Sequence, residues 1–108
     1  MALTRKFLDL SAAHLTPQDA AYLEECAWPS REGVLCMRYE HGFFVYAQHD
    51  LDCYGEELSG NLRRAMTKAC ELGCDYLMFD QDAEPQEGLP VFDAETGQET
   101  TWEALQAA

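Results

Sequence analysis

The sequence predicts an α+β fold built on a four-stranded antiparallel sheet. Four segments carry strand signals and two carry helix signals, and they follow one another as strand, helix, strand, strand, helix, strand. Apolar residues make up 47% of the 108 residues, which is enough for a hydrophobic core. A chain of this length is expected to form one domain.

The first strand is predicted over residues 5–12, where apolar and polar side chains alternate. A helix follows it. Thr16 is placed to cap this helix, Pro17 suits its first turn, and Asp19 completes a capping-box-like pair. The helix is expected to end before Pro29, because the residue before a proline is pushed out of the helical conformation.

The clearest hairpin signal joins two β-branched and aromatic runs, residues 34–39 and 43–47. Gly42 lies between them and can take the positive φ of a tight turn. A polar loop over residues 48–58 follows. The short apolar run 76–79 predicts a last strand that is buried on both faces.

The second helix is predicted to begin after Ser59, which is a plausible cap. Apolar side chains recur at helical spacing along it, at Leu62, Ala65, Met66, Ala69 and Leu72. Gly73 follows directly, where a left-handed C-terminal cap belongs. Arg63, Arg64 and Lys68 lie off the apolar stripe and are expected to be solvated.

This order of elements is that of the ferredoxin-like split βαβ arrangement (β-α-β-β-α-β). Right-handed crossovers would place both helices on one face of the sheet. The other face would then need cover, which the C-terminal segment with Trp102 could provide. We therefore predict one acidic domain over residues 1–108, with a core over about 4–80 and an acidic C-terminal extension over 81–108.

Charge is distributed very unevenly along the chain. The net charge is −13, and no lysine or arginine follows Lys68. Ten carboxylates occupy this last part of the chain: Glu71, Asp75, Asp80, Asp82, Glu84, Glu87, Asp93, Glu95, Glu99 and Glu103. Such a field repels nucleic acid and anionic membranes, and it attracts basic protein surfaces or metal cations.

The sequence also predicts a cytoplasmic location. No stretch approaches the roughly 20 apolar residues of a membrane span. The first twelve residues are too interrupted by charge for a signal peptide. The five cysteines, an odd number at irregular spacing, argue against a disulfide framework.

One motif suggests an enzyme. Asp80-Gln81-Asp82 follows an apolar strand, and two carboxylates so placed can bind Mg²⁺, as in phosphotransfer enzymes of the haloacid dehalogenase type. Those enzymes carry the motif on their first strand and need a downstream lysine, which this chain lacks after Lys68. A metal-dependent hydrolase or phosphotransfer site at Asp80 and Asp82 is therefore the alternative hypothesis. The favoured one has no catalytic residue and no cofactor.

Aromatic residues of the hairpin, Tyr39, Phe43, Phe44 and Tyr46, could form an RNA-stacking face. The net charge argues against direct nucleic-acid binding, because the flanking basic residues are missing. These side chains are expected to pack in the core and at the sheet edge. The hairpin edge leaves open whether two copies pair as a homodimer.

The acidic half predicts a partner. Carboxylates spaced along a surface can imitate DNA phosphates and occupy the basic groove of a nucleic-acid-binding protein. Acidity that serves only solubility is the alternative. The residues expected to contact a basic protein surface are Glu56, Glu57, Asp75, Asp80, Asp82, Glu84, Glu87, Asp93 and Glu95.

Several stretches resemble a small bacterial family known only as a domain of unknown function and often found on plasmids and prophages. They are SAAHLT (11–16), GFFVY (42–46), LGCDYLMFDQD (72–82) and GLPVFD (88–93). The resemblance spans roughly residues 8–93 and brings no catalytic residues with it. It implies an accessory protein of a mobile element that acts in a bacterial host cell.

The functional prediction combines these observations. We expect a non-enzymatic inhibitor of a nucleic-acid-binding host defence protein, of the anti-CRISPR or anti-restriction type, that presents a DNA-mimicking carboxylate surface. A structural interaction module of plasmid or prophage upkeep is a further alternative.

Overall fold

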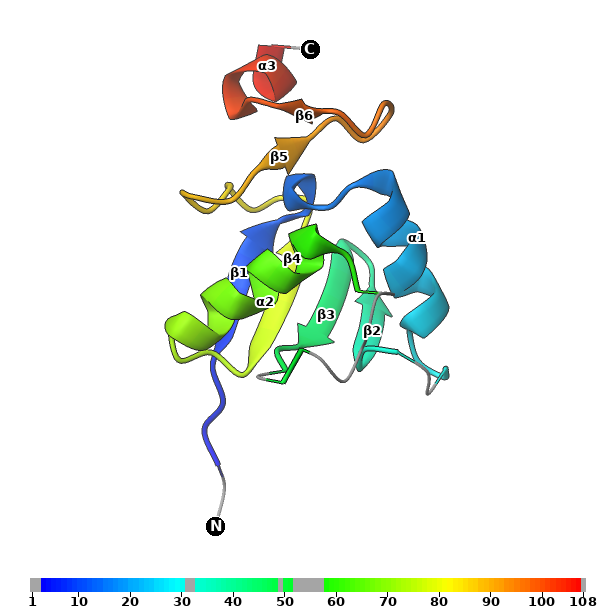
Figure 1. Cartoon of the computed structure of the whole chain (residues 1–108), viewed down its shortest axis with the longest axis vertical. Coiled ribbons are helices and arrows are strands. Elements are labelled where there is room, and N and C mark those ends of the chain that lie inside the picture. Colours follow the sequence, from blue (N-terminus) through cyan, green and yellow to red (C-terminus); the bar gives the residue numbers. More distant parts are fainter. Residues whose placement is uncertain (1–2, 31–32, 49, 52–57, 108) are drawn as a thin grey trace.

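The computed structural model describes residues 3–30, 33–48, 50–51 and 58–107. These residues form a mixed α+β fold with three α-helices and one 3-10 helix (Figure 1). The elements in chain order are β1 (Phe7–Ser11), η1 (Ala12–His14), α1 (Pro17–Cys26), β2 (Cys36–Tyr39), β3 (Gly42–Tyr46), α2 (Gly60–Glu71), β4 (Tyr76–Asp80), β5 (Val91–Phe92), β6 (Glu99–Thr100) and α3 (Trp102–Ala107).

The main sheet has four strands in the order β1-β4-β3-β2. Strand β1 runs parallel to β4, whereas the other two pairs are antiparallel. The predicted order of elements along the chain is confirmed. The prediction of a ferredoxin-like, fully antiparallel sheet is wrong, because β4 lies between β1 and β3 and shares the direction of β1.

The position at which α2 begins explains why the sheet is not ferredoxin-like. Strand β3 ends beside the start of β4, where Tyr46 pairs with Tyr76. Ser59, which caps α2, instead contacts Asp19 at the start of α1, near the opposite end of the sheet. Helix α2 therefore begins near the end of the sheet opposite to the end of β3, and after α2 the chain enters β4 antiparallel to β3 (Figure 1). A ferredoxin-like sheet would require α2 to start where β3 ends.

Both helices pack on one face of the sheet, as predicted. The core cluster combines Leu23 of α1 with four residues of the predicted α2 stripe and with alternate residues of the strands. The fifth predicted member of the stripe, Leu72, caps the end of α2 and is half exposed, so it does not join the core. Leu10, Val45, Leu77 and Phe79 contribute the strand side of this core and are almost completely buried. The alternation shows that the sheet has one covered face and one face without a helix.

Two glycines are required by the backbone. Gly73 ends α2 with a φ of 75°, the predicted left-handed cap. Gly42 has the predicted positive φ, at 158°. A Cβ atom there would lie 1.7 Å from the carbonyl oxygen of Phe79, and only glycine permits this close approach of β3 to β4.

A buried polar network joins the starts of the two helices. The Asp19 carboxylate is 3% exposed and accepts hydrogen bonds from Ser59 Oγ at 2.7 Å and from Asn61 Nδ2 at 2.8 Å. It also forms the predicted capping box with Thr16. The Asn61 side chain donates a second bond, 2.6 Å long, to the carbonyl oxygen of His14. Hydrogen bonds thus compensate the buried charge and fix η1, α1 and α2 together.

Residues 81–107 form what we call the C-terminal lobe. Its strands β5 and β6 pair in a separate two-stranded sheet, and Thr101 Oγ1 accepts a hydrogen bond from the Ala104 amide at the start of α3. The lobe lies beyond the end of the main sheet where β1 and η1 meet (Figure 1). The expectation that the segment with Trp102 covers the second face of the sheet is therefore wrong.

His14 holds the lobe to the rest of the protein. Its side chain is 2% exposed, and Nδ1 lies 2.7 Å from the carbonyl oxygen of Pro90. Its Nε2 accepts a hydrogen bond of 2.9 Å from the Gln86 amide. A carbonyl can only accept and an amide N–H can only donate, so the neutral imidazole with its proton on Nδ1 satisfies both contacts. Burial lowers the pKa of His14 and favours this neutral form.

Replacing Asp19 with alanine should destabilise the fold strongly. The Asp19→Ala substitution leaves the Ser59 hydroxyl and the Asn61 amide without their acceptor, so the free energy of unfolding should fall by about 2–4 kcal/mol. Urea unfolding followed by circular dichroism measures this change. Asp82→Ala, at an exposed carboxylate, serves as the control and should change stability by less than about 0.5 kcal/mol. A comparable effect of both substitutions would contradict the role of the network.

Acidification should weaken the fold through His14. Its pKa in the folded protein lies below the unfolded value of 6.5, so only the unfolded chain gains this proton as the pH falls through that value. The free energy of unfolding should therefore be lower at about pH 5.5 than at about pH 7.5. The His14→Gln variant, although less stable overall, should show a smaller difference between the two pH values. Equal pH dependence in both proteins would show that His14 does not contribute.

Candidate protein-binding surface

The C-terminal lobe concentrates negative charge at one end of the molecule. It contains seven carboxylates and no lysine or arginine. Six of the seven residues are exposed: Asp82, Glu84, Glu87, Glu95, Glu99 and Glu103. Asp93 is partly buried, and its Oδ1 accepts the backbone amides of Glu95 and Thr96 to shape the turn before β6. Among the described residues, no basic side chain pairs with a carboxylate of the lobe.

A second acidic group lies where the main sheet meets the lobe. Asp80 ends β4 beside Ser11, and its Oδ1 accepts the Asp82 amide at 2.9 Å. Desolvation by the neighbouring protein raises the pKa of Asp9 on β1, and the Asp80 carboxylate adds to this effect. Burial likewise raises the pKa of Tyr39, with contributions from Asp80, Asp9 and Asp82. Asp80 and Asp82 are joined by a hydrogen bond at this end of the sheet, and Asp9 lies two residues from the level of Asp80 on the neighbouring strand.

Sequence reasoning missed Asp9. This residue becomes part of the acidic group because β1 pairs in parallel with β4 and places it level with Met78, two residues before Asp80. The predicted antiparallel sheet gave no reason to bring the two together.

Other predicted contact residues lie elsewhere. Asp75 precedes β4 and is therefore about 16 Å from Asp80, given the rise of an extended strand. Its carboxylate lies 3.8 Å from Arg5 and accepts the backbone amide of Lys6. It belongs to the opposite end of the sheet, not to the lobe. Glu56 and Glu57 lie outside the described residues.

The face of the sheet opposite the helices carries a continuous apolar and aromatic surface, which we call the open face. Its members, from β1, β4, β3 and the β2 edge, are Phe7, Tyr76, Met78, Phe44, Tyr46, Leu35 and Met37. The Phe44 ring stacks on Tyr76 with centroids 5.0 Å apart and meets Phe7 edge-on at 5.8 Å. The Tyr46 ring meets Tyr76 edge-on at 5.7 Å.

The open face corrects two expectations. Leu77 and Phe79 are buried, whereas Tyr76 and Met78 are only partly buried, so the strand predicted to be buried on both faces is covered on one. Phe43 joins the core, but Phe44 and Tyr46 belong to the open face. The physical reason is the position of the lobe, which lies beyond the end of the sheet, so none of the described helices or strands packs over this face.

The apolar surface continues past the β2 edge. Ala27 bridges to Cys36, which brings Trp28 beside β2. Trp28 and Leu35 line a hollow of about 290 Å³ together with Val34. Trp28 is 65% exposed.

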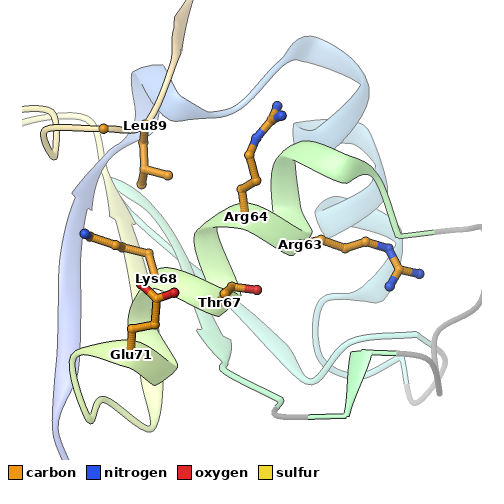
Figure 2. A pocket seen from close by; sticks show the side chains of 7 residues that line it. Arg63, Arg64, Thr67, Lys68, Glu71 and Leu89 are labelled. Atoms are coloured by element: carbon orange, nitrogen blue, oxygen red, sulfur yellow. The ribbon is translucent and has the colours of Figure 1, made fainter.

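A groove beside α2 is lined in part by three basic residues, Arg63, Arg64 and Lys68 (Figure 2). Its volume is about 390 Å³, and Leu89 lies between the ends of Arg64 and Lys68 in this view. Arg63 points to the other side of the helix, where it donates to the carbonyl oxygens of Leu51 and Leu58.

Carboxylates limit what this groove can bind. Glu71 lines the groove itself, and Glu99 lines an adjoining hollow that shares Arg64 and Leu89. Two carboxylates therefore offset the charge of Arg64 and Lys68. The groove is not strongly positive.

The described residues offer little reactive chemistry. Among them, no three His, Cys, Asp or Glu side chains are grouped so as to hold a metal ion. Burial raises the pKa of Cys36 to about 12, with Cys26 adding to the effect, so this thiol stays protonated at neutral pH. None of the helices in the described ranges is long and apolar enough to cross a membrane.

A comparison with protein-family profiles identifies the family of this chain. The profile described as "Family of unknown function (DUF5983) C-terminal domain" matches residues 7–94. The chain belongs to the DUF5983 family. The predicted resemblance to a domain of unknown function is thereby confirmed. The DUF5983 match includes the main sheet, η1, α1, α2 and β5, and it ends before β6 and α3. No curated protein and no solved structure matches the chain.

Magnesium at millimolar concentration should leave the amide resonances of Asp80 and Asp82 unchanged. One oxygen of Asp80 already accepts a backbone hydrogen bond, and the described surroundings add no grouped third ligand. A titration followed by nuclear magnetic resonance tests this expectation. A saturable shift centred on both residues, lost in Asp80→Asn and kept in Asp75→Asn, would instead favour the metal-dependent enzyme hypothesis.

Proposed function

We propose that this DUF5983 protein is a non-enzymatic binding protein whose C-terminal lobe contacts a basic surface of another protein. The observation that carries the proposal is the charge of the lobe, with seven carboxylates, no basic residue and no ion pair within the described part of the chain. Six of these carboxylate residues are exposed and therefore available to a partner.

Electrostatics favours a cationic target. Like charges so close together repel one another, and a protein gains nothing for its own fold by collecting them on one small lobe. A partner that carries lysines and arginines would relieve this repulsion and would be steered toward the lobe from a distance. Asp80 and Asp82 extend the negative surface from the lobe onto the main sheet.

Within this proposal the partner is a nucleic-acid-binding protein. Its basic groove is shaped for a row of phosphates, and carboxylates in the turn after β5, on β6 and on α3 offer a comparable row of negative charges. The lobe would act as a DNA mimic that blocks the groove. A plasmid or prophage origin, which the sequence resemblance predicts, would favour an inhibitor of host defence, of the anti-restriction or anti-CRISPR type, acting in the bacterial cytoplasm.

Neutralising part of the lobe should weaken this interaction. The triple variant Asp82→Asn, Glu84→Gln and Glu87→Gln should bind the partner about tenfold more weakly, because each exposed charge contributes a fraction of a kcal/mol. Its affinity should also depend less steeply on salt concentration. A partner captured from bacterial lysate and then purified permits both measurements by calorimetry.

A matched control separates local charge from net charge. The exposed residues Glu25, Glu40 and Glu71 lie outside the lobe, and their simultaneous replacement by glutamine changes the net charge by the same amount. This control should bind nearly as tightly as the unmodified protein. If both triple variants bind equally, the lobe is not the contact surface.

A further inference from the structure

The open face exposes large apolar side chains that do not contribute to the hydrophobic core. Six large apolar side chains of the described residues are exposed, and four of them lie on or beside this face: Phe7, Trp28, Leu35 and Met37. Their exposed fractions range from 49% to 65%. Contiguous apolar surface of this kind marks an interaction site in a water-soluble protein fold.

The centre of the open face is preorganised for contact. The rings of Phe7, Phe44, Tyr76 and Tyr46 touch one another in a continuous series. They stand on three neighbouring strands, whose backbone hydrogen bonds hold them in place. A ligand that lies across these rings would bury apolar area without ordering mobile loops.

Charged residues on the open face indicate which kind of molecule can bind there. Asp9 lies on the open side of β1 at the level of Met78, and Asp80 lies two residues further along β4, on the same side of the sheet. The nearest described cations are directed elsewhere. Arg5 pairs with Asp75 at the opposite end of the sheet, and Arg38 pairs with Glu24 on the helix side.

This charge excludes several occupants. A second copy would bring another net charge of −13 toward the same carboxylates, and a nucleic acid or an anionic membrane would also be repelled. A polypeptide with lysine or arginine beside apolar side chains complements both the rings and the carboxylates.

We propose that the open face docks an amphipathic, basic segment of a partner protein. Its apolar side chains pack on Phe44 and Tyr76, and its basic side chains reach Asp9 and Asp80. This inference rests on the proposed function in taking the partner to be basic, but it assigns the main contact to the sheet instead of the lobe. The lobe then contributes long-range attraction, and the open face contributes buried apolar area.

Synthetic peptides test the proposal with the full chain. A peptide of alternating lysine and leucine is titrated into isotope-labelled protein, and amide shifts are followed by nuclear magnetic resonance. We expect saturable shifts at Phe7, Asp9, Phe44 and Tyr76. A lysine–serine peptide and a glutamate–leucine peptide should each bind at least about tenfold more weakly, because each lacks one half of the required chemistry.

Point variants assign the binding to the open face. The double variant Phe7→Ser and Met37→Ser removes two side chains that are already half exposed, so the fold should persist, and a thermal unfolding curve checks this. Its dissociation constant for the lysine–leucine peptide should rise about tenfold. Leu72→Ser, which removes a comparably exposed leucine at the end of α2, should leave the constant unchanged.

The outcomes separate this inference from the proposed function. Equal binding of the lysine–leucine and lysine–serine peptides, or shifts confined to residues 81–107, would overturn the docking role of the open face and leave the lobe as the contact surface. If the triple amide variant of the lobe loses its partner but keeps the lysine–leucine peptide on the open face, both proposals stand.

Other occupants of the open face would overturn the proposal directly. Equally tight binding of the glutamate–leucine peptide would show that basic side chains are not recognised. A thymidine oligonucleotide that shifts the open-face amides would indicate nucleic acid as the ligand. A dimer in sedimentation experiments that Met37→Ser abolishes would indicate a second copy of the chain.

Discussion

The buried carboxylate of Asp19 is the interaction on which the rest of the structure depends. It joins the starts of α1 and α2 near the end of β1, and Asn61 links it to the backbone of His14. The His14 ring in turn holds the loop that leads into the C-terminal lobe. This chain of contacts keeps the lobe at the end of the sheet (Figure 1). Within the described part of the chain, no helix covers the other face of the sheet and no basic side chain pairs with a carboxylate of the lobe.

Two surfaces with different chemistry therefore meet at one edge. The open face offers aromatic rings fixed on strands, and the lobe offers charge on exposed side chains. Asp9 and Asp80 lie at the junction and belong to both. Apolar contact is effective only at short range, whereas charge acts over about a Debye length, roughly 8 Å at physiological salt. The combination suits a protein that must first attract a cationic partner and then hold it.

The sequence predicted the features that depend on neighbouring residues and missed those that depend on distant ones. The Thr16–Asp19 capping box, the Ser59 cap, the apolar stripe of α2 and the Gly73 cap all follow from local spacing. The β1–β4 pairing could not be predicted, because it depends on the end of the sheet at which α2 begins, and local spacing does not determine that. Charge segregation along the chain did indicate the acidic lobe. The open face was missed because alternating apolar residues look alike whether or not a second layer covers them.

The attachment of the last elements has an evolutionary consequence. Strand β6 pairs with β5 outside the main sheet, no residue of α3 is buried, and the DUF5983 match ends before both. Substitutions there remove few core contacts and so cost little folding stability. Relatives could thus diversify this terminal part and change their binding partners, while the β1–β4 framework that carries it stays the same.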